Sequence, residues 1–228
     1  MSAKTSVAFL CPVAEAVDAS VFQKALAIVS TASKHGYTVE YVGVTERTLI
    51  HSARNLLANS FVATDCEWAF WMDADMDLPA NVIPYMVEKA KELGTKFLTG
   101  VYYQRKGTQH LPVIWRKEPE LENGGKLEAL PMDLHHFIIP PETMPLEVDA
   151  CGFGCVLMHR EMLEKMEKPY FNISNDLSED FYFCIKAKKA GFKLWADPSF
   201  ECGHYGDRAR ITRKDMKIDE KNKVEIKI

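Results

Sequence analysis

The chain has 228 residues, of which 47% are hydrophobic and 26% charged, and its formal net charge is −4 with a pI of about 6.0. These values fit a single compact domain with a buried core, and the overall charge does not point to nucleic-acid binding. No apolar run approaches the roughly 18 residues of a membrane span, and the N-terminus lacks the long apolar stretch of a signal peptide. We therefore expect a cytoplasmic protein.

Strand and helix patterns alternate through the N-terminal half. Strands are predicted over residues 6–14, 38–44, 67–72 and 96–104. Helices are predicted over residues 18–37 and 46–64 and from Pro79 to Gly94. This alternation predicts an α/β fold with a central, mostly parallel sheet flanked by helices. In such sheets ligands bind beyond the carboxyl ends of the strands.

The C-terminal half is less regular. Strands are predicted over residues 111–116 and 148–160, with a final strand pair over 192–204 broken at Pro198, and helices over 161–168 and 178–191. Residues 117–147 are rich in Pro, Glu and Gly, which predicts a long loop. Residues 207–228 form a highly charged tail, so the predicted domain covers residues 1–206.

The segment WAFWMDADMD carries an apolar strand into the acids Asp73, Asp75 and Asp77. Residues two apart in an extended segment point the same way, so Asp73 and Asp75 can face one ion. Close carboxylates repel each other unless a cation compensates them, and oxygen ligands favour Mg²⁺ or Mn²⁺. The alternative is a solvated acidic turn at the end of a strand.

Three further patterns are weaker alone. Glu179 and Asp180 lie in the first turn of a predicted helix, where the dipole stabilises negative charge and a carboxylate could act as a base. His204, flanked by glycine, could add a nitrogen ligand to a metal site. Arg54, followed by Asn55, could orient a diphosphate or an acid pair. Each pattern also occurs as ordinary surface or structural chemistry.

The chain has six cysteines, for which neither a disulfide framework nor a zinc finger is expected. The spacing of Cys151, Cys155, Cys202 and His204 is not that of a standard finger. Gly152–Gly154 separates the first two of these cysteines, and its glycines allow close approach of a ligand or of backbone, or mark a bulge.

Taken in order, these motifs resemble a family 2-like glycosyltransferase with a GT-A fold. They are ARN, the strand into DAD, the glycine-rich DACGFGCVLMHR, SEDFYFCIKAKKAGFKLWADP and the final GH, and the resemblance runs from about Ser6 to His204.

The resemblance implies a role for each matching residue. Asp180 would be the general base, with Glu179 beside it. The metal, Mn²⁺ or Mg²⁺, would be bound by Asp73, Asp75 and His204. The residues implied in nucleotide-sugar binding are Pro12, Ala14, Glu15, Arg54, Asp73, Gly152, Phe153 and Gly154.

The implied reaction moves one sugar from a nucleotide-sugar, with UDP as the expected nucleotide, to an acceptor hydroxyl with inversion. The Q-x-x-R-W motif of processive synthases is absent, although Gln104-Arg105 and Trp115-Arg116 occur apart, so we expect a non-processive enzyme. The acceptor, whether glycan, protein or small molecule, is left open. The 117–147 loop could serve as a lid.

Four other functions fit parts of the sequence. A nucleotidyltransferase usually needs a glycine-rich basic loop after the first strand, which CPVAEAVDAS lacks, and a dehalogenase-like phosphatase carries its acid pair after the first strand. A non-catalytic module binding nucleotide-sugar or carbohydrate would keep the fold without turnover. A DNA-modifying enzyme could use the basic stretch of Arg208, Arg210, Arg213 and Lys214, although a solvated tail is the preferred interpretation.

Overall fold

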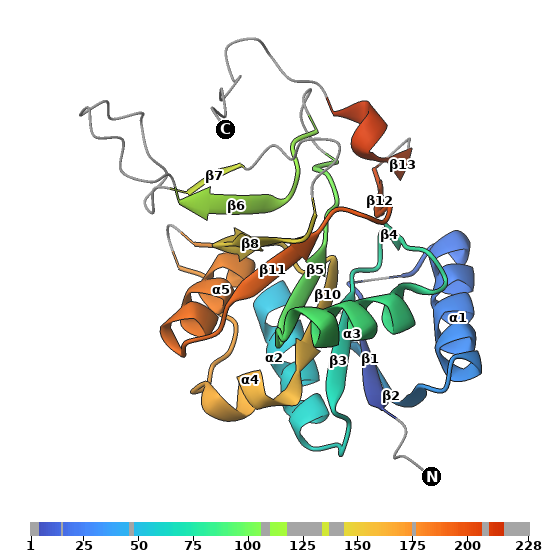
Figure 1. Ribbon diagram of the computed structural model, residues 1–228, viewed down its shortest axis with the longest axis horizontal. Coiled ribbons are helices and arrows are strands. Elements are labelled where there is room, and N and C mark those ends of the chain that lie inside the picture. Colours follow the sequence, from blue (N-terminus) through green and yellow to red (C-terminus); the bar gives the residue numbers. More distant parts are fainter. Residues whose placement is uncertain are drawn as a thin grey trace.

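A central sheet of seven strands organises the protein (Figure 1). The computed structural model describes residues 5–14, 16–45, 48–105, 110–117, 134–136, 144–174, 177–206 and 210–216. The strands of the sheet are β1 (Ser6–Pro12), β2 (Thr38–Thr45), β3 (Trp68–Met72), β5 (Phe97–Gly100), β8 (Leu146–Val148), β10 (Cys155–His159) and β11 (Leu194–Asp197).

The strand order is β2-β1-β3-β10-β5-β11-β8. The pairs β1–β2, β1–β3 and β5–β11 are parallel, whereas β10 and β8 run antiparallel to their neighbours. Five strands therefore share one direction, and their carboxyl ends meet at one edge. The predicted fold class, a compact α/β domain with a mostly parallel sheet flanked by helices, is confirmed.

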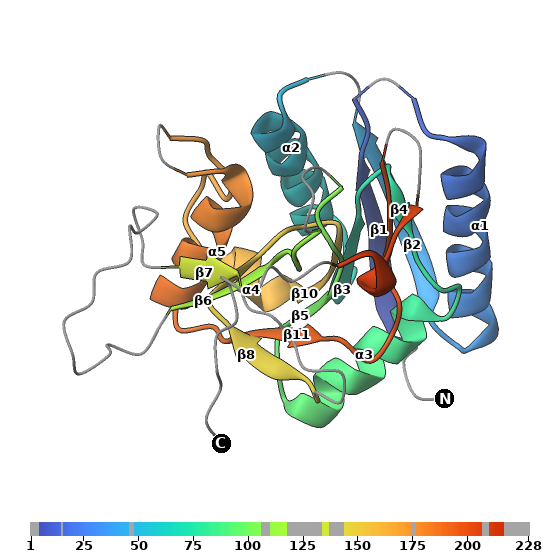
Figure 2. The same cartoon turned by 90° about the horizontal axis from the view of Figure 1, so that it is seen from above.

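Helices cover both faces of the sheet (Figure 2). Helices α1 (Ala19–Lys34) and α3 (Val82–Leu93) pack on one face, and α2 (Ile50–Val62), α4 (Arg160–Lys165) and α5 (Glu179–Lys189) on the other. Helix α3 ends at Gly94, whose left-handed φ of 63° suits a residue without a side chain, as the sequence predicted.

The strand that leads to the acids is buried on both faces. Trp68, Phe70 and Met72 enter the core under α1 and α3, whereas Ala69 and Trp71 enter the core under α2 and α5. This alternation explains why β3 is an unbroken apolar run, since a central strand has no solvent-facing side. A strand packed from both sides is a rigid support for whatever follows it.

Two small sheets extend the fold. The first has the order β13-β12-β4 and is formed by β4 (Met76–Asp77), β12 (Gly203–Tyr205) and β13 (Arg210–Ile211), followed by a 3-10 turn at Arg213–Asp215. The second has the order β7-β6-β9 and is formed by β6 (Ile114–Lys117), β7 (Leu134–His136) and β9 (Ala150–Cys151).

Several element bounds differ from those predicted. The strand predicted over 148–160 is divided into β9 and β10 by Gly152–Gly154, and the strand predicted over 96–104 ends at Gly100. Most of the predicted 117–147 loop lies outside the described residues, but its described part includes β7 and the start of β8. Of the predicted tail, residues 210–216 are described, and the domain boundary at residue 206 stays a prediction. Among the described residues, no helix is long and apolar enough to cross a bilayer.

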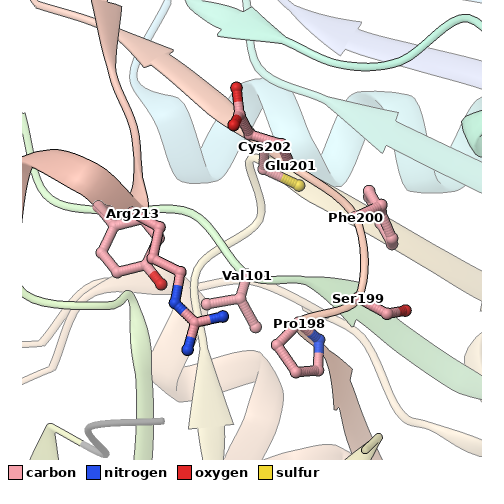
Figure 3. Close-up of a pocket in the computed structure, with 8 residues that line it drawn as sticks. Val101, Pro198, Ser199, Phe200, Glu201, Cys202 and Arg213 are labelled. Carbon is pink, nitrogen blue, oxygen red and sulfur yellow. The ribbon is translucent and has the colours of Figure 1, made fainter. Parts of the chain in front are cut away.

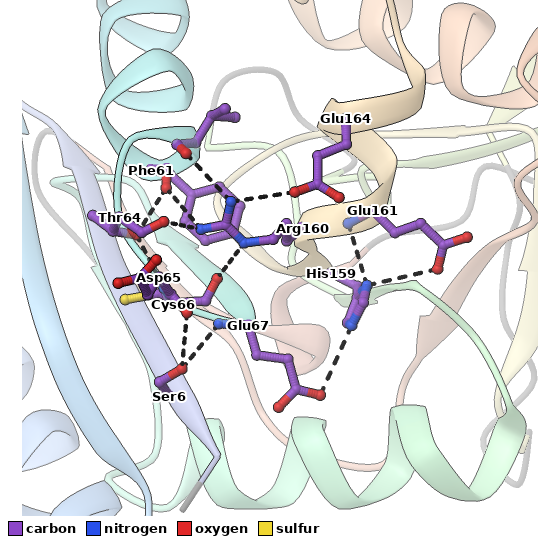
Figure 4. A network of polar contacts seen from close by, with 11 residues as sticks. Ser6, Phe61, Thr64, Asp65, Cys66, Glu67, His159, Arg160, Glu161 and Glu164 are labelled. Atoms are coloured by element: carbon purple, nitrogen blue, oxygen red, sulfur yellow. Dashed lines mark hydrogen bonds and ion pairs between the residues drawn. The ribbon is translucent and has the colours of Figure 1, made fainter.

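Arg160, the first residue of α4, ties the end of α2 to the sheet (Figure 4). Its guanidinium donates to the carbonyls of Cys66 at 2.9 Å and Val62 at 3.3 Å, and to that of Thr64. It also lies 5.4 Å from the centre of the Phe61 ring. These carbonyls follow or end a helix and lack helical partners, so one side chain satisfies several acceptors.

We expect Arg160→Met to lower the free energy of unfolding by about 2 kcal/mol, because hydrogen bonds from a charged donor are lost and the acceptors remain partly buried. Urea unfolding followed by circular dichroism measures the loss. Lys165→Met is the matched control, since Lys165 makes an exposed ion pair with Glu161 and its removal should change stability by under about 0.5 kcal/mol. Equal effects of the two substitutions would contradict the role of Arg160.

Candidate functional site

The site lies where β1 and β3 end side by side. Leu10 pairs with Trp71, so the ends of these parallel strands are in register. Burial, followed by the charges of Asp73 and Asp75, raises the pKa of the Cys11 thiol to about 12. Asp73 and Asp75 follow the last residue of β3 and therefore lie at this edge, as expected for residues beyond the carboxyl ends of a parallel sheet.

The predicted nucleotide contacts follow the same strand. Pro12 is the buried last residue of β1, and Ala14 is exposed just beyond it. Glu15 lies outside the described residues. The described part of this loop thus leaves the sheet at the same edge as the acids.

The acidic segment is a turn rather than the extended segment that the sequence suggested. The Met76 N–H donates to the Asp73 carbonyl at 3.2 Å, which closes the turn, and the Asp73 N–H donates to the Gly154 carbonyl at 3.2 Å. Because of the turn, Asp73 and Asp75 have different partners. Asp73 faces Arg54, whereas Asp75 faces His204 and Arg105.

The third acid, Asp77, is held by basic residues away from this turn. Its carboxylate pairs with Lys24 of α1 at 3.0 Å and with Arg210 of β13. Arg210, which the sequence placed in a basic stretch, also pairs with Glu201 at 2.7 Å. Asp77 therefore joins α1, β4 and β13.

Asp75 and His204 form the oxygen and nitrogen pair of the site. His204 Nε2 lies 3.4 Å from Asp75 Oδ2, and His204 Nδ1 lies 2.8 Å from the Tyr103 carbonyl. Although burial lowers the pKa of His204, its hydrogen bonds to Asp75 and to the Tyr103 carbonyl raise it overall. Burial raises the pKa of Asp75, but His204 and Arg105 outweigh it and lower the pKa.

This pair fits a divalent cation. Nδ1–H can donate to the Tyr103 carbonyl, which leaves the lone pair of Nε2 available for a cation, and metal-binding histidines are commonly fixed in this way. Carboxylate oxygen and imidazole nitrogen together suit Mn²⁺, and Mg²⁺ accepts the carboxylate. Among the described residues, no three His, Cys, Asp or Glu side chains gather to hold an ion unaided. Two protein ligands leave coordination positions for phosphate oxygens and water.

A second cluster surrounds Arg54 on α2. Its guanidinium contacts Asp73 at 3.2 Å, Glu179 at 3.4 Å and Asp180 at 3.5 Å, and it lies 5.2 Å from the centre of the Phe153 ring. The side chain of Arg54 is only 2% exposed. The charges of the three carboxylates outweigh the burial that would lower its pKa and raise it overall. Arg54 therefore remains a cation among acids from two distant segments.

The environment of Asp180 raises its pKa well above the ordinary value. Burial is the largest cause, followed by the opposing effect of Arg54, which lowers it, and then by Glu179 and Asp73, which raise it. Asp180 retains a side-chain exposure of 21%, whereas Glu179 retains 10%. Of the two acids at the start of α5, Asp180 is thus the more accessible to a substrate proton.

Asn55, next to Arg54, connects α2 to the segment before α5. Its amide donates to the Phe171 carbonyl at 2.6 Å, and its Oδ1 accepts from the N–H groups of Tyr170 and Phe171 at 3.0 and 3.1 Å. These bonds fix the chain that leads to Asp180. The residue thus supports the cluster through the backbone.

The glycines of Gly152–Gly154 make room for Tyr102, which the sequence did not single out. A Cβ on Gly152 would lie 2.0 Å from Tyr102 Oη, and the Gly154 N–H donates to this hydroxyl at 3.2 Å. Burial, then the charges of Asp180 and Asp73, raise the pKa of Tyr102 well above its ordinary value, so the phenol stays protonated. The paired glycines beside a strand were the sequence signal for such a neighbour, because they indicate close approach of another group.

Phe153 is fully buried rather than exposed to a ligand. Its ring packs against Trp71, Phe171 and Phe183, with centroids 5.8, 5.0 and 4.9 Å away. It supports the Arg54 guanidinium from below. Its implied role in donor binding stays a prediction, and a buried Phe153 would act on the donor indirectly, through Arg54.

A small pocket opens at the same edge, beside β11 (Figure 3). It is lined by Val101, Tyr103, the segment 198–202 and Arg213, and its volume of about 120 Å³ is far below the roughly 300–1,000 Å³ of ligand sites. Burial and Cys155 raise the pKa of the Cys202 thiol, so it offers no thiolate nucleophile. Cys151 belongs to the core on the opposite face from Cys155 and Cys202, which separates the set considered for zinc.

No family model matches this chain, and no curated protein sequence matches it. Solved structures with a similar fold include the following two. A197 from STIV aligns over 93% of this chain and 94% of that chain, with a TM-score of 0.66 and 20% identity. GalNAc-T7, solved with UDP, GalNAc and Mn²⁺, aligns over 90% of this chain and 44% of that chain, with a TM-score of 0.62 and 14% identity. The chain thus has a glycosyltransferase-like GT-A fold, and membership of family 2 stays a prediction.

Proposed function

We propose that the protein is a metal-dependent glycosyltransferase that moves one sugar from a nucleotide-sugar, with UDP as the nucleotide, to an acceptor hydroxyl. The observation that carries this proposal is the Asp75–His204 pair at the exit of β3, beside an Arg54 cluster that contains Asp180. The GT-A fold and the UDP and Mn²⁺ of GalNAc-T7 support it.

In this proposal Asp75 and His204 would hold Mn²⁺ or Mg²⁺. A bound divalent ion would neutralise the charge that develops on the departing diphosphate. Pro12, Ala14 and Glu15 would contact the nucleotide, and Asp73 the ribose or the ion. Arg54 would keep Asp73 and Asp180 in place as their shared counter-charge. Gly152–Gly154 would lie on the sugar and acceptor side.

Asp180 would accept the proton of the acceptor hydroxyl. The hydroxyl oxygen then attacks the anomeric carbon, and the bond from that carbon to the diphosphate oxygen breaks with its electron pair. A single displacement of this kind inverts the anomeric centre. Glu179 would hold Asp180 in position, and transfer of one sugar per event would make the enzyme non-processive.

The test is binding and turnover of a panel of nucleotide-sugars with Mn²⁺. We expect one donor to raise the melting temperature and to release nucleoside diphosphate, and Asp75→Ala or a chelator to abolish both effects. Asp65→Ala is the matched control, because Asp65 is exposed at the opposite end of β3 and should change neither.

Other outcomes would identify other functions. Donor binding without release of nucleoside diphosphate would indicate a binding module, and release of pyrophosphate from a nucleoside triphosphate would indicate a nucleotidyltransferase. Donor binding that is unaffected by Asp75→Ala and by chelation would overturn the metal site.

A further inference from the structure

Two basic groups converge on one oxygen atom of Asp75. Arg105 Nη1 contacts Asp75 Oδ2, and His204 Nε2 lies 3.4 Å from the same oxygen. Arg105 follows β5 in the segment that also supplies the Tyr103 carbonyl to His204. The guanidinium therefore contacts the same carboxylate oxygen as the other candidate ligand.

A guanidinium and a metal ion cannot share this position. Arg has no lone pair to offer a metal and stays protonated at all ordinary pH values. Without Arg105 or an ion, the partly buried Asp75 carboxylate would keep His204 as its one basic contact among the described residues. In the ligand-free protein Arg105 provides a second basic contact.

The exposure of the Arg105 side chain would allow it to leave this position. Its side chain is 43% exposed, compared with 2% for Arg54, so it is far less enclosed by neighbouring groups than Arg54 is. After displacement, the guanidinium stays within one side-chain length of Asp75. Its fork of donors then suits the phosphate oxygens that an ion at Asp75 would bring there.

We propose that Arg105 substitutes for the divalent ion at Asp75 in the ligand-free protein and transfers to the donor diphosphate when the ion binds. This inference rests on the proposed function. It makes Arg105 a competitor of the ion when no nucleotide is present, and a binding residue for the diphosphate once the ion is in place. Binding of the ion and of the donor is therefore coupled, because the diphosphate gives the displaced cation a new partner.

The test measures two affinities of Arg105→Gln. Mn²⁺ affinity without nucleotide, followed by the electron paramagnetic resonance signal of free Mn²⁺, should rise about two- to fivefold, as expected when a half-exposed ion pair is removed. UDP affinity at saturating Mn²⁺, measured by calorimetry, should fall about three- to tenfold, as expected for a lost charged contact to phosphate. A purely structural role of Arg105 would move both affinities in the same direction.

Matched variants complete the test. Arg105→Lys keeps the charge and should stay within about twofold of the wild type in Mn²⁺ affinity. Lys34→Gln removes a charge at the end of α1 and should change neither affinity. If Arg105→Gln binds Mn²⁺ as well as or more weakly than the wild type, while Asp75→Ala still abolishes Mn²⁺ binding, the inference about Arg105 is overturned and the metal site of the proposed function is not. Wild-type Mn²⁺ binding by Asp75→Ala overturns the metal site of the proposed function.

Discussion

Replacing Asp180 by Asn is expected to lower turnover by about 100- to 10,000-fold, the usual contribution of a general base. The amide has almost the same shape as the carboxylate, but it cannot accept the proton of the acceptor hydroxyl. Donor affinity should stay close to that of the wild type, because Asp180 lies in the Arg54 cluster and not at the Asp75–His204 pair. Release of nucleoside diphosphate and calorimetric donor binding measure the two quantities.

Glu92→Gln is the control for this variant, since Glu92 is an exposed carboxylate of α3 that pairs with Lys89. It should leave turnover unchanged. The wild-type profile of kcat/KM against pH should fall on its acid side at a pH above the ordinary aspartate range, because burial raises the pKa of Asp180 in the free protein. Turnover that survives Asp180→Asn would exclude this residue as the base.

Arg54→Met is expected to lower the free energy of unfolding by about 3–5 kcal/mol near pH 8, the usual effect of leaving buried charges without a partner. The variant keeps Asp73, Glu179 and Asp180 close together but removes their cation. Because Arg54 lowers the pKa of Asp180, its loss raises that pKa further above the unfolded value. A carboxyl group with a raised folded-state pKa destabilises the protein as pH rises from the unfolded pKa through the folded one.

The loss caused by Arg54→Met should therefore shrink as the pH falls toward about 4, the ordinary carboxyl value, because protonated acids no longer repel each other. Adding Asp180→Asn to Arg54→Met should restore part of the stability, and urea unfolding at several pH values measures both effects. A loss that is independent of pH and is not relieved by Asp180→Asn would show that Arg54 acts by packing on Phe153 instead.

The sequence predicted the features that depend on local patterns. The apolar run Trp68–Met72 indicated a central strand, and Asp75 lies just beyond the carboxyl end of that strand, as the pattern implied. Gly94 marked the end of α3. These predictions succeed because periodicity and backbone preference act within a few residues of the chain.

Contacts between residues far apart in the chain could not be predicted from such local patterns. Arg54 meets Glu179 and Asp180 across more than a hundred residues, and β10 enters the sheet antiparallel between β3 and β5. Both depend on how separate elements pack, which a single sequence does not encode as a pattern. The turn at Asp73–Asp75 was mistaken for an extended segment because its geometry follows from β4 pairing with β12.

The position of Asp77 affects how an alanine scan of this acidic segment would be interpreted. Its carboxylate links α1 and β13, and the adjacent β4 pairs with the strand that carries His204. Loss of Asp77 would shift that histidine and could reduce metal binding indirectly. The result would resemble the loss of a proposed ligand, although Asp77 itself is not one. A measurement of local order, such as amide hydrogen exchange in β12, distinguishes a residue that holds β12 in place from one that binds the ion.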